Sequence, residues 1–168
     1  AFEKAIALAS NEIIFLSDQD DIWFPGKYQR ILEEFNVDES TVLVVHSFAS
    51  INEFGEDIAH DWLSQRAAKV SGLSFLFREL LKPSVFGSAS AFKSSLREIM
   101  LPFPDYVYAH DHWLTVCASI AGNSKFIVDN LVYRRIHLYN LTPKNGLRYS
   151  KKLYVRLLFL RMIFSMFY

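Results

Sequence analysis

Apolar residues in the first part of the chain follow a pattern that predicts a helix and then a buried strand. Phe2, Ile6 and Ala9 recur at helical spacing. The β-branched and aromatic run Ile13–Ser17 follows directly and predicts a strand. Because a helix that leads into a buried strand is typical of a parallel sheet, this pattern indicates an α/β fold.

The same pattern predicts the next elements. Pro25 and Gly26 precede a helix over Lys27–Phe35, in which the apolar residues make one stripe. The continuous apolar run Val42–Val45 predicts a strand that is covered on both faces. Polar and small residues over 52–57 predict a turn at the surface.

Helical spacing returns in the second half of the chain, at Leu73–Leu81 and at Lys93–Met100. In the first of these helices we expect one buried apolar stripe, made by Leu73, Leu76, Phe77, Leu80 and Leu81. A further helix is predicted from residue 109 to about residue 121, followed by two short strands over residues 125–128 and 131–135.

Composition limits the size and the partners of the protein. The 168 residues, 51% of them hydrophobic, suffice for one domain with a substantial core. Eighteen basic and eighteen acidic residues give zero formal charge, so no overall field attracts nucleic acid, and we expect no nucleic-acid partner.

The single cysteine and the first residues bear on the compartment and on the extent of the domain. Cys117 stands among apolar residues, which excludes a disulfide framework and suits a reducing, cytoplasmic compartment. Ala1 lies within the first predicted helix, and neither an initiator Met nor a signal peptide precedes it. We expect that the amino-terminal part of a larger domain is missing.

The end of the chain, residues 146–168, interleaves basic residues with Leu, Phe, Met and Tyr and predicts a basic amphipathic helix. No charge-free run there approaches the roughly 18–20 residues that a membrane-spanning helix needs. Two interpretations stay open: a helix that lies on the inner, anionic face of a membrane, or a core helix whose partner is absent. The chain is therefore divided into residues 1–145 and residues 146–168.

A cluster of carboxylates follows the first predicted strand. Asp18, Asp20 and Asp21 come directly after the apolar run, where open α/β sheets place their ligands. Because burying three like charges together is unfavourable, the cluster favours a bound cation. The alternative is a turn in which one of these carboxylates caps the following segment, the role we expect for Asp21 before Trp23.

Two later segments also carry candidate chemistry. Small residues over 87–92 let a ligand or another backbone come close, although a tightly packed strand crossing has the same composition. Asp111 stands in the first turn of the helix that begins near residue 109, where the helix dipole favours a carboxylate. It could therefore be a helix cap or a catalytic group.

Four segments together resemble motifs of the family-2 glycosyltransferases of the GT-A fold, closest to their bacterial rhamnosyltransferase-like members. Residues 15–23 resemble the metal-binding DxD segment in its SDQDDIW form, and residues 87–92 the small-residue strand beside the sugar site. Residues 110–114 are similar to the HDxW segment that carries the catalytic base, and residues 135–140 to the RxHxxN loop. The order and separations of the four agree with the family over residues 1–145.

The resemblance implies a partial GT-A, Rossmann-like fold, in which helices flank a mixed sheet and a basic amphipathic helix follows at the carboxyl end. It also implies that the chain lacks the amino-terminal nucleotide-binding portion of the family. In one departure, Arg134 occupies a position that is usually Tyr, and Tyr133 precedes it. The alternative to an enzyme is a truncated, non-catalytic remnant; a metal-dependent hydrolase is disfavoured because a denser set of His and Asp residues is absent.

By this resemblance, the chain would transfer a sugar, with rhamnose as one candidate, in the synthesis of cell-surface polysaccharide. Asp20 would bind Mn²⁺ or Mg²⁺, Asp18 would hold the donor's ribose or a metal-bound water, and His137 would complete the metal site. Asp111 would act as the general base for an inverting reaction. The expected partners are a nucleotide-sugar donor and a glycan or lipid-linked acceptor. Contacts with donor or acceptor are expected from Gly87, Ser88, Ala89, Trp23, His110, Trp113, Arg135 and Asn140, although a Trp in the position of Trp113 is more often part of the core.

Overall fold

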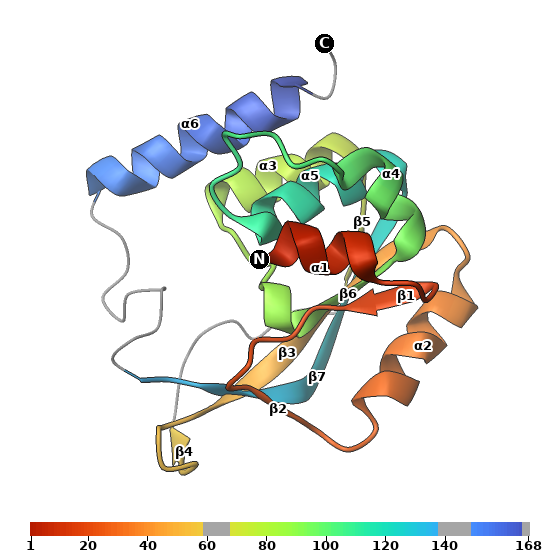
Figure 1. The fold of residues 1–168 in the computed structure, drawn as a ribbon, viewed down its shortest axis with the longest axis vertical. Coiled ribbons are helices and arrows are strands. Elements are labelled where there is room, and N and C mark those ends of the chain that lie inside the picture. The colour runs from red at the N-terminus through yellow and green to blue at the C-terminus, as the bar shows by residue number, and fades with distance from the viewer. Residues whose placement is uncertain (59–67, 138–148, 166–168) are drawn as a thin grey trace.

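The computed structural model describes residues 1–58, 68–137 and 149–165, and Figure 1 shows their arrangement around one mixed sheet. Within the described residues the strands are β1 (Ile13–Phe15), β2 (Ile22–Trp23), β3 (Thr41–Ile51), β4 (Asp57–Ile58), β5 (Ala68–Val70), β6 (Ser90–Lys93) and β7 (Asn123–Arg135). The α-helices are α1 (Phe2–Leu8), α2 (Lys27–Val37), α3 (Gly72–Leu81), α4 (Arg97–Met100), α5 (His110–Ala121) and α6 (Tyr149–Ser165). Two short 3₁₀ helices are η1 (Gly87–Ala89) and η2 (Ser94–Leu96).

The sheet has the strand order β1-β6-β3-β7-β2, with β4 added to β3 and β5 added to β7. Strands β3 and β7 pair in parallel, with Val44 opposite Lys125, and every other strand pair of the described residues is antiparallel. The mixed sheet flanked by helices confirms the predicted fold class. The expectation that Ile13–Ser17 belongs to a parallel arrangement is wrong within the described residues, because β1 pairs there with the antiparallel strand β6.

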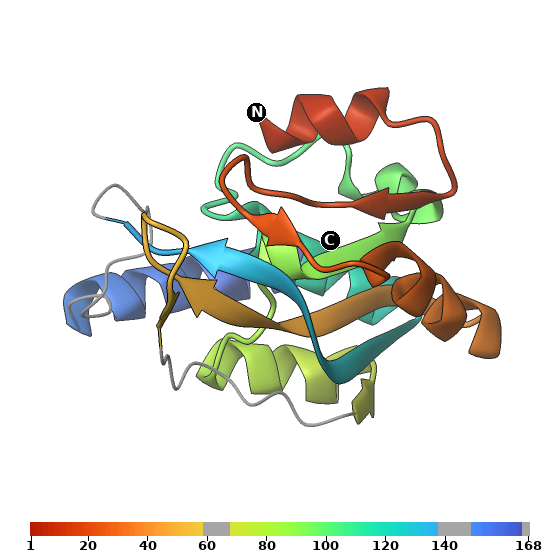
Figure 2. The same cartoon turned by 90° about the horizontal axis from the view of Figure 1, so that it is seen from below.

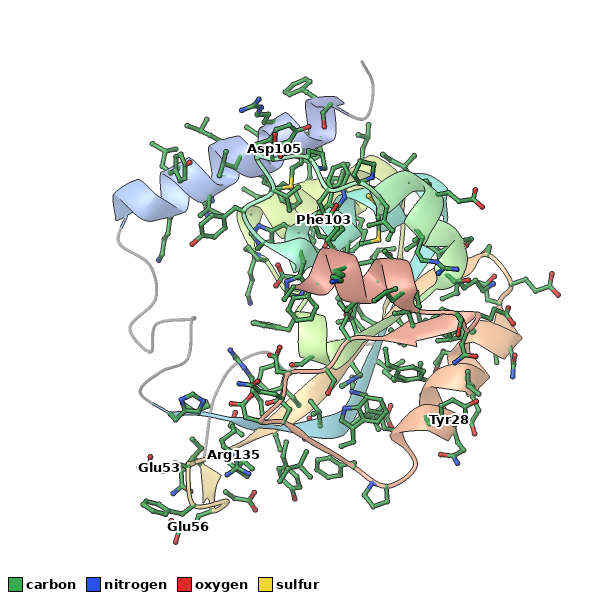
Figure 3. All side chains as sticks on the ribbon, viewed as in Figure 1. Tyr28, Glu53, Glu56, Phe103, Asp105 and Arg135 are labelled. Carbon is green, nitrogen blue, oxygen red and sulfur yellow. The ribbon has the colours of Figure 1, made fainter. Side chains whose placement is uncertain are left out.

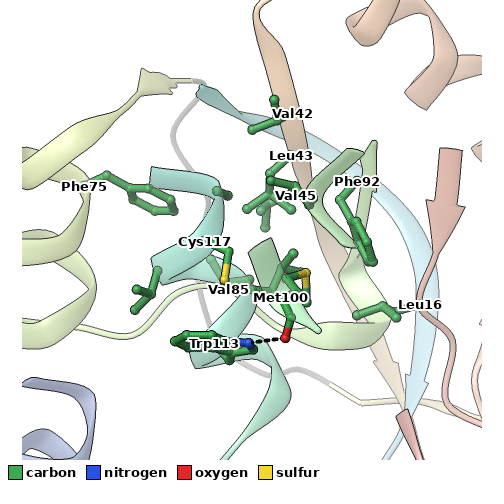
Figure 4. Close-up of a cluster of buried hydrophobic side chains, with 14 of the residues drawn as sticks. Leu16, Val42, Leu43, Val45, Phe75, Val85, Phe92, Met100, Trp113 and Cys117 are labelled. Carbon is green, nitrogen blue, oxygen red and sulfur yellow. Dashed lines mark hydrogen bonds between the residues drawn. The ribbon is translucent and has the colours of Figure 1, made fainter. Parts of the chain in front are cut away.

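The core lies on both faces of β3, as the continuous apolar run predicted. On one face, Leu43 and Val45 pack with α3 and α5 around Phe75 and Trp113 (Figure 4). On the other face, Val44 joins the cluster that Ile31 and Phe35 of α2 complete, and Figure 2 shows the helices on either side of the sheet. Alternate residues of a strand point to opposite faces, so an apolar run without polar breaks fits a strand in the middle of the molecule.

Three predicted elements differ from the structure. The two short strands over 125–128 and 131–135 are one strand, β7, and the helix over Lys93–Met100 is divided between η2 and α4. In α3 the fully buried residues are Phe75, Leu76 and Glu79. Three residues of the predicted buried stripe are instead exposed: Leu73, Phe77 and Leu81. The periodicity located the helix correctly but not the face that it buries.

The carboxyl-terminal helix α6 packs one face on the domain. Val155, Phe159 and Met162 are buried there, and the last two belong to the main apolar cluster. Among the described helices, none has the length and apolar character needed to cross a membrane. One face of α6 therefore contributes to the core of this domain, which differs from the expectation that a core partner is absent, while its opposite face remains exposed.

Candidate functional site

The acidic turn, residues 17–21, connects β1 with β2 and lies against the end of β7. Antiparallel pairing sets Ile22 opposite Tyr133, so the residues just before Ile22 meet those just after Tyr133. His137 Nε2 lies 2.8 Å from Asp20 Oδ2. The pairing of β2 with β7 thus brings together two of the three predicted metal ligands across 117 positions of sequence.

Arg135 holds the acidic turn in place. Its backbone N–H donates to Asp21 Oδ1 at 3.1 Å and its Nε donates to the carbonyl oxygen of Asp20 at 3.2 Å. Its Nη1 donates to the carbonyl oxygens of Asn52 and Glu53, both at 3.1 Å, in the turn after β3 (Figure 3). Arg135 was predicted to contact donor or acceptor, and the structure assigns its guanidinium to positioning two turns.

Asp21 connects the acidic turn to η1. Burial is the main cause that raises the pKa of Asp21, and the charges of Asp18 and Asp20 raise it further. Hydrogen bonds from the Ser88 side chain and the Arg135 backbone oppose this rise. Asp21 Oδ2 is buried and has no hydrogen-bond partner among the described residues. Asp21 therefore joins the turn to Ser88, whereas the sequence predicted a cap before Trp23.

Trp23 lies at the edge of this arrangement with its ring partly exposed. Its indole N–H donates to Ser17 Oγ at 3.1 Å. The ammonium of Lys27 lies 4.2 Å from the centre of the Trp23 ring. The ring is thus fixed by one hydrogen bond and one cation–π contact, in a position beside the acidic turn.

Lys27 is a residue of the site that the sequence did not single out. It is only 1% exposed, and its Nζ donates to the carbonyl oxygen of Ser88 at 3.1 Å. Burial lowers the pKa of Lys27 to about 8, against the opposing effect of Asp21. Burial and then the charge of Lys27 lower the pKa of the neighbouring His46 to about 4, so His46 is neutral at pH 7. Lys27 is thus a buried cation that joins α2, Trp23 and η1.

His110 connects η1 to the start of α5. Its ring stacks on Phe2 with 3.7 Å between ring centres, and a Cβ added to Gly87 would overlap its Nε2. Gly87 is therefore needed for this close approach of the His110 ring, whereas the small-residue run was expected to admit a ligand or another backbone. Burial is the main cause that lowers the pKa of His110, and the negative charges of Asp111 and Asp18 oppose it. His110 thus lies within electrostatic reach of both predicted functional carboxylates.

Asp111 occupies the first turn of α5, after the N-cap Ala109. Its Oδ1 accepts a hydrogen bond from the backbone N–H of His112 at 2.8 Å. This local bond is of the kind that a capping carboxylate makes at a helix N-terminus. Asp111 is half-buried, so the capping interaction does not seal it from solvent.

Trp113 belongs to the core, which corrects its prediction as a donor or acceptor contact. Its side chain is buried, and its indole N–H donates to the carbonyl oxygen of Met100 at 2.9 Å (Figure 4). The residue stands three positions after His110, on the helix face that meets α4 and the sheet. Asn140, the last predicted contact, lies outside the described residues.

The donor atoms partly fit the predicted cation. A carboxylate oxygen of Asp20 lies beside an imidazole nitrogen of His137. Mn²⁺ and Mg²⁺ bind such a pair when further oxygen ligands complete the coordination shell. In the part of the chain that the structure describes, no three His, Cys, Asp or Glu side chains are gathered as a metal site. Asp18 is close to Asp20 in sequence, but it does not form a three-ligand metal site with Asp20 and His137 among the described residues.

Contacts connect the predicted site residues into one region. Asp20 meets His137, Asp21 meets Ser88, and Gly87 packs against His110, the neighbour of Asp111. Four segments that are distant in sequence therefore meet at one side of the sheet.

Comparisons with known proteins identify relatives of this chain. The sequence model described as glycosyl transferase family 2 matches residues 1–100. An uncharacterised glycosyltransferase of Nostoc sp. is 30% identical over 142 residues, which cover 82% of this chain and 43% of the relative.

Solved structures of S. aureus TarS are similar in fold. TarS residues 1–349 in complex with UDP-GlcNAc match with a TM-score of 0.60 and 15% identity, covering 97% of this chain and 52% of that chain. A second TarS structure matches with a TM-score of 0.60 and 16% identity, covering 98% of this chain and 30% of that chain. The chain thus spans about half the length, or less, of the proteins that it matches.

Proposed function

The chain belongs to glycosyl transferase family 2, and on that premise we propose that it carries the metal and acceptor half of a metal-dependent, inverting glycosyltransferase. The donor is a nucleotide-diphosphate sugar, with rhamnose as one candidate sugar. The acceptor is a glycan or a lipid-linked sugar in the synthesis of cell-surface polysaccharide. The observation that carries the proposal is the contact of Asp20 with His137 in a region that also includes His110 and Asp111.

The reaction joins an acceptor oxygen to the anomeric carbon of the donor sugar. Asp111 takes the proton of the acceptor hydroxyl as that oxygen attacks, and the bond from the anomeric carbon to the diphosphate oxygen breaks with its electron pair on the diphosphate. Attack opposite to the leaving group inverts the anomeric carbon. His110, the residue before Asp111, is half-buried and packed on Phe2, so the base follows directly after a ring that the fold holds in place.

The leaving diphosphate gathers negative charge that the site must balance. A Mn²⁺ or Mg²⁺ ion, bound by Asp20 and His137 with Asp18 as a further ligand or ribose contact, would supply positive charge there. Lys27 adds a buried cation behind η1, where its Nζ bonds to Ser88. The structure of TarS with UDP-GlcNAc supports a UDP-sugar as the first donor to test.

Other residues near the acidic turn are candidates for contact with the donor sugar or the acceptor. The partly exposed ring of Trp23 offers a face for a sugar. Gly87, Ser88 and Ala89 are buried beneath the site, where the His110 ring lies against Gly87. The proposal places the enzyme in the cytoplasm, with peripheral contact at the inner face of the membrane, where a lipid-linked acceptor would be presented.

Replacement of the proposed base tests the reaction. In the full-length protein, we expect Asp111→Asn to abolish release of the nucleoside diphosphate from a sugar donor while UDP-GlcNAc binding survives, because the amide cannot take a proton. The exposed Asp105, in the segment before α5, gives the matched control Asp105→Asn, which should keep both properties. Normal turnover of Asp111→Asn would remove Asp111 as the base.

The alternative, a truncated remnant without catalytic activity, makes a different prediction. Such a protein would neither bind UDP-GlcNAc nor release a nucleoside diphosphate from any donor, with or without Mn²⁺. The full-length wild-type protein therefore distinguishes the two functions before any substitution is made.

A further inference from the structure

Helix α6 carries an apolar stripe on the face opposite to its buried one. Leu153, Leu157, Leu160 and Phe164 are spaced by four, three and four residues, so they share one side of the helix. Leu153, Leu157 and Phe164 are between 53% and 61% exposed. We name these four residues the outer face of α6. Leu160 is half-buried. Exposed singly, such residues are ordinary on a protein surface, but three exposed apolar residues on one side of a helix need an explanation.

Basic residues flank the outer face on both sides. At 100° per residue, Lys152 and Arg156 fall on one side of the stripe and Arg161 on the other. All three are exposed. The helix contains no acidic residue, and the last Asp or Glu of the sequence is Asp129. An apolar stripe with cations on both sides, here Lys152 and Arg156 on one and Arg161 on the other, is the surface pattern of a helix that lies in the plane of an anionic membrane.

Contacts fix how the helix presents this face. Arg156 Nη2 donates to the carbonyl oxygen of Leu81, and the Arg161 guanidinium lies 4.2 Å from the centre of the Tyr106 ring. Residues of the domain thus hold Arg156 and Arg161 beside the stripe. Leu81, whose carbonyl oxygen Arg156 contacts at the end of α3, is itself 69% exposed. The exposed Asp105 precedes Tyr106, and Figure 3 shows it beside α6, so one carboxylate adjoins this surface near Arg161.

We propose that the outer face of α6 docks on an anionic lipid surface, with Leu153, Leu157, Leu160 and Phe164 entering the interface and the flanking Lys and Arg side chains contacting lipid phosphates. The proposal deepens the peripheral membrane contact of the proposed function by naming the surface and the lipid that make it, and its evidence comes from this helix. A second copy of the chain fits the same face less well, because two such faces in contact would bring their rows of cations together. Lipid headgroups instead supply the missing negative charge.

The test is cosedimentation of the full-length protein with vesicles. Wild type should bind vesicles that contain phosphatidylglycerol more tightly than vesicles of pure phosphatidylcholine, and added salt should weaken this binding. Leu153→Ser with Leu157→Ser should lower binding to the anionic vesicles roughly tenfold or more, since two apolar side chains no longer leave water. The matched control is Leu8→Ser with Val37→Ser, two exposed apolar residues of α1 and α2, which should bind as wild type does.

Several outcomes would overturn the proposal. These are equal binding of wild type to both kinds of vesicle, no binding at all, or unchanged binding of the Leu153/Leu157 variant. If the face joins two copies of the chain, size-exclusion chromatography will show a wild-type dimer that the double variant converts to a monomer, without lipid binding. UDP-GlcNAc binding is measured on the same variants and should stay unchanged, so failure of the docking proposal is distinguishable from failure of the proposed function.

Discussion

The protonation of Lys27 makes the stability of the fold depend on pH. Burial lowers its pKa from 10.5 to about 8, so between these values the unfolded chain binds more protons at Lys27 than the folded chain. The free energy of unfolding of wild type, minus that of Lys27→Met, should therefore rise with pH across this window, by about 3 kcal/mol. Denaturant unfolding of both proteins at several pH values measures the difference. A difference that stays flat from pH 8 to 10.5 would show that Lys27 is not buried as a cation.

The close approach of Gly87 and His110 can be tested by substitution. A Cβ at this position would overlap Nε2 of His110, so Gly87→Ala should destabilise the fold by about 1–3 kcal/mol and displace the imidazole. In a His110→Ala background the same substitution should lower the free energy of unfolding much less, because the overlapping ring is gone. Urea unfolding of the four proteins of this cycle measures the coupling. Equal effects in both backgrounds would contradict the close approach of Gly87 and His110.

The sequence predicts some residues of the candidate site and not others. The motif resemblance selected Asp20 and His137, which the structure brings into contact. It could not select Lys27, because a lysine at the start of an amphipathic helix is ordinarily exposed, and only the three-dimensional fold places Trp23 and Ser88 around it. The role of Arg135 as a clamp on two turns likewise depends on a strand pairing that the sequence does not reveal.

At the scale of elements, α5 combines the proposed base at its start with core residues along its length. Trp113→Phe removes the hydrogen bond from the indole N–H to Met100 and leaves that buried carbonyl without its partner, so we expect a loss of about 1–3 kcal/mol in the free energy of unfolding. UDP-GlcNAc affinity should not change, since Trp113 is buried away from solvent. Unchanged stability together with weaker donor binding would show that Trp113 contacts the donor and is not only a core residue.

Element positions were predicted better than their pairing. The helix over Lys27–Phe35 and the strand at Val42–Val45 follow from local periodicity, and both are present as α2 and within β3. The buried face of α3 was predicted wrongly because Leu73, Phe77 and Leu81 have the same spacing as a buried stripe. Periodicity reports that a helix has an apolar face, but it does not report whether a neighbouring element covers that face.

At the scale of the whole molecule, the sheet order determines which motifs meet. Parallel pairing of β3 with β7, and antiparallel pairing of β2 with β7, carry the end of β7 to the acidic turn. The sequence predicted a mixed α/β sheet but not this order, because strand pairing depends on contacts between distant segments. The chain covers 43% of its relative from Nostoc sp., so the complete reaction is a property to be tested in the full-length protein.

The proposed function depends on the binding by Asp20 of the cation that holds the donor diphosphate. Isothermal titration calorimetry of the full-length protein with UDP-GlcNAc, in Mn²⁺ and then in excess chelator, measures this dependence. Wild type should bind only with Mn²⁺, Asp20→Ala should lose affinity roughly tenfold or more, and the exposed control Asp57→Ala should bind as wild type does. Metal-dependent binding that survives intact in Asp20→Ala would show that Asp20 does not bind the cation.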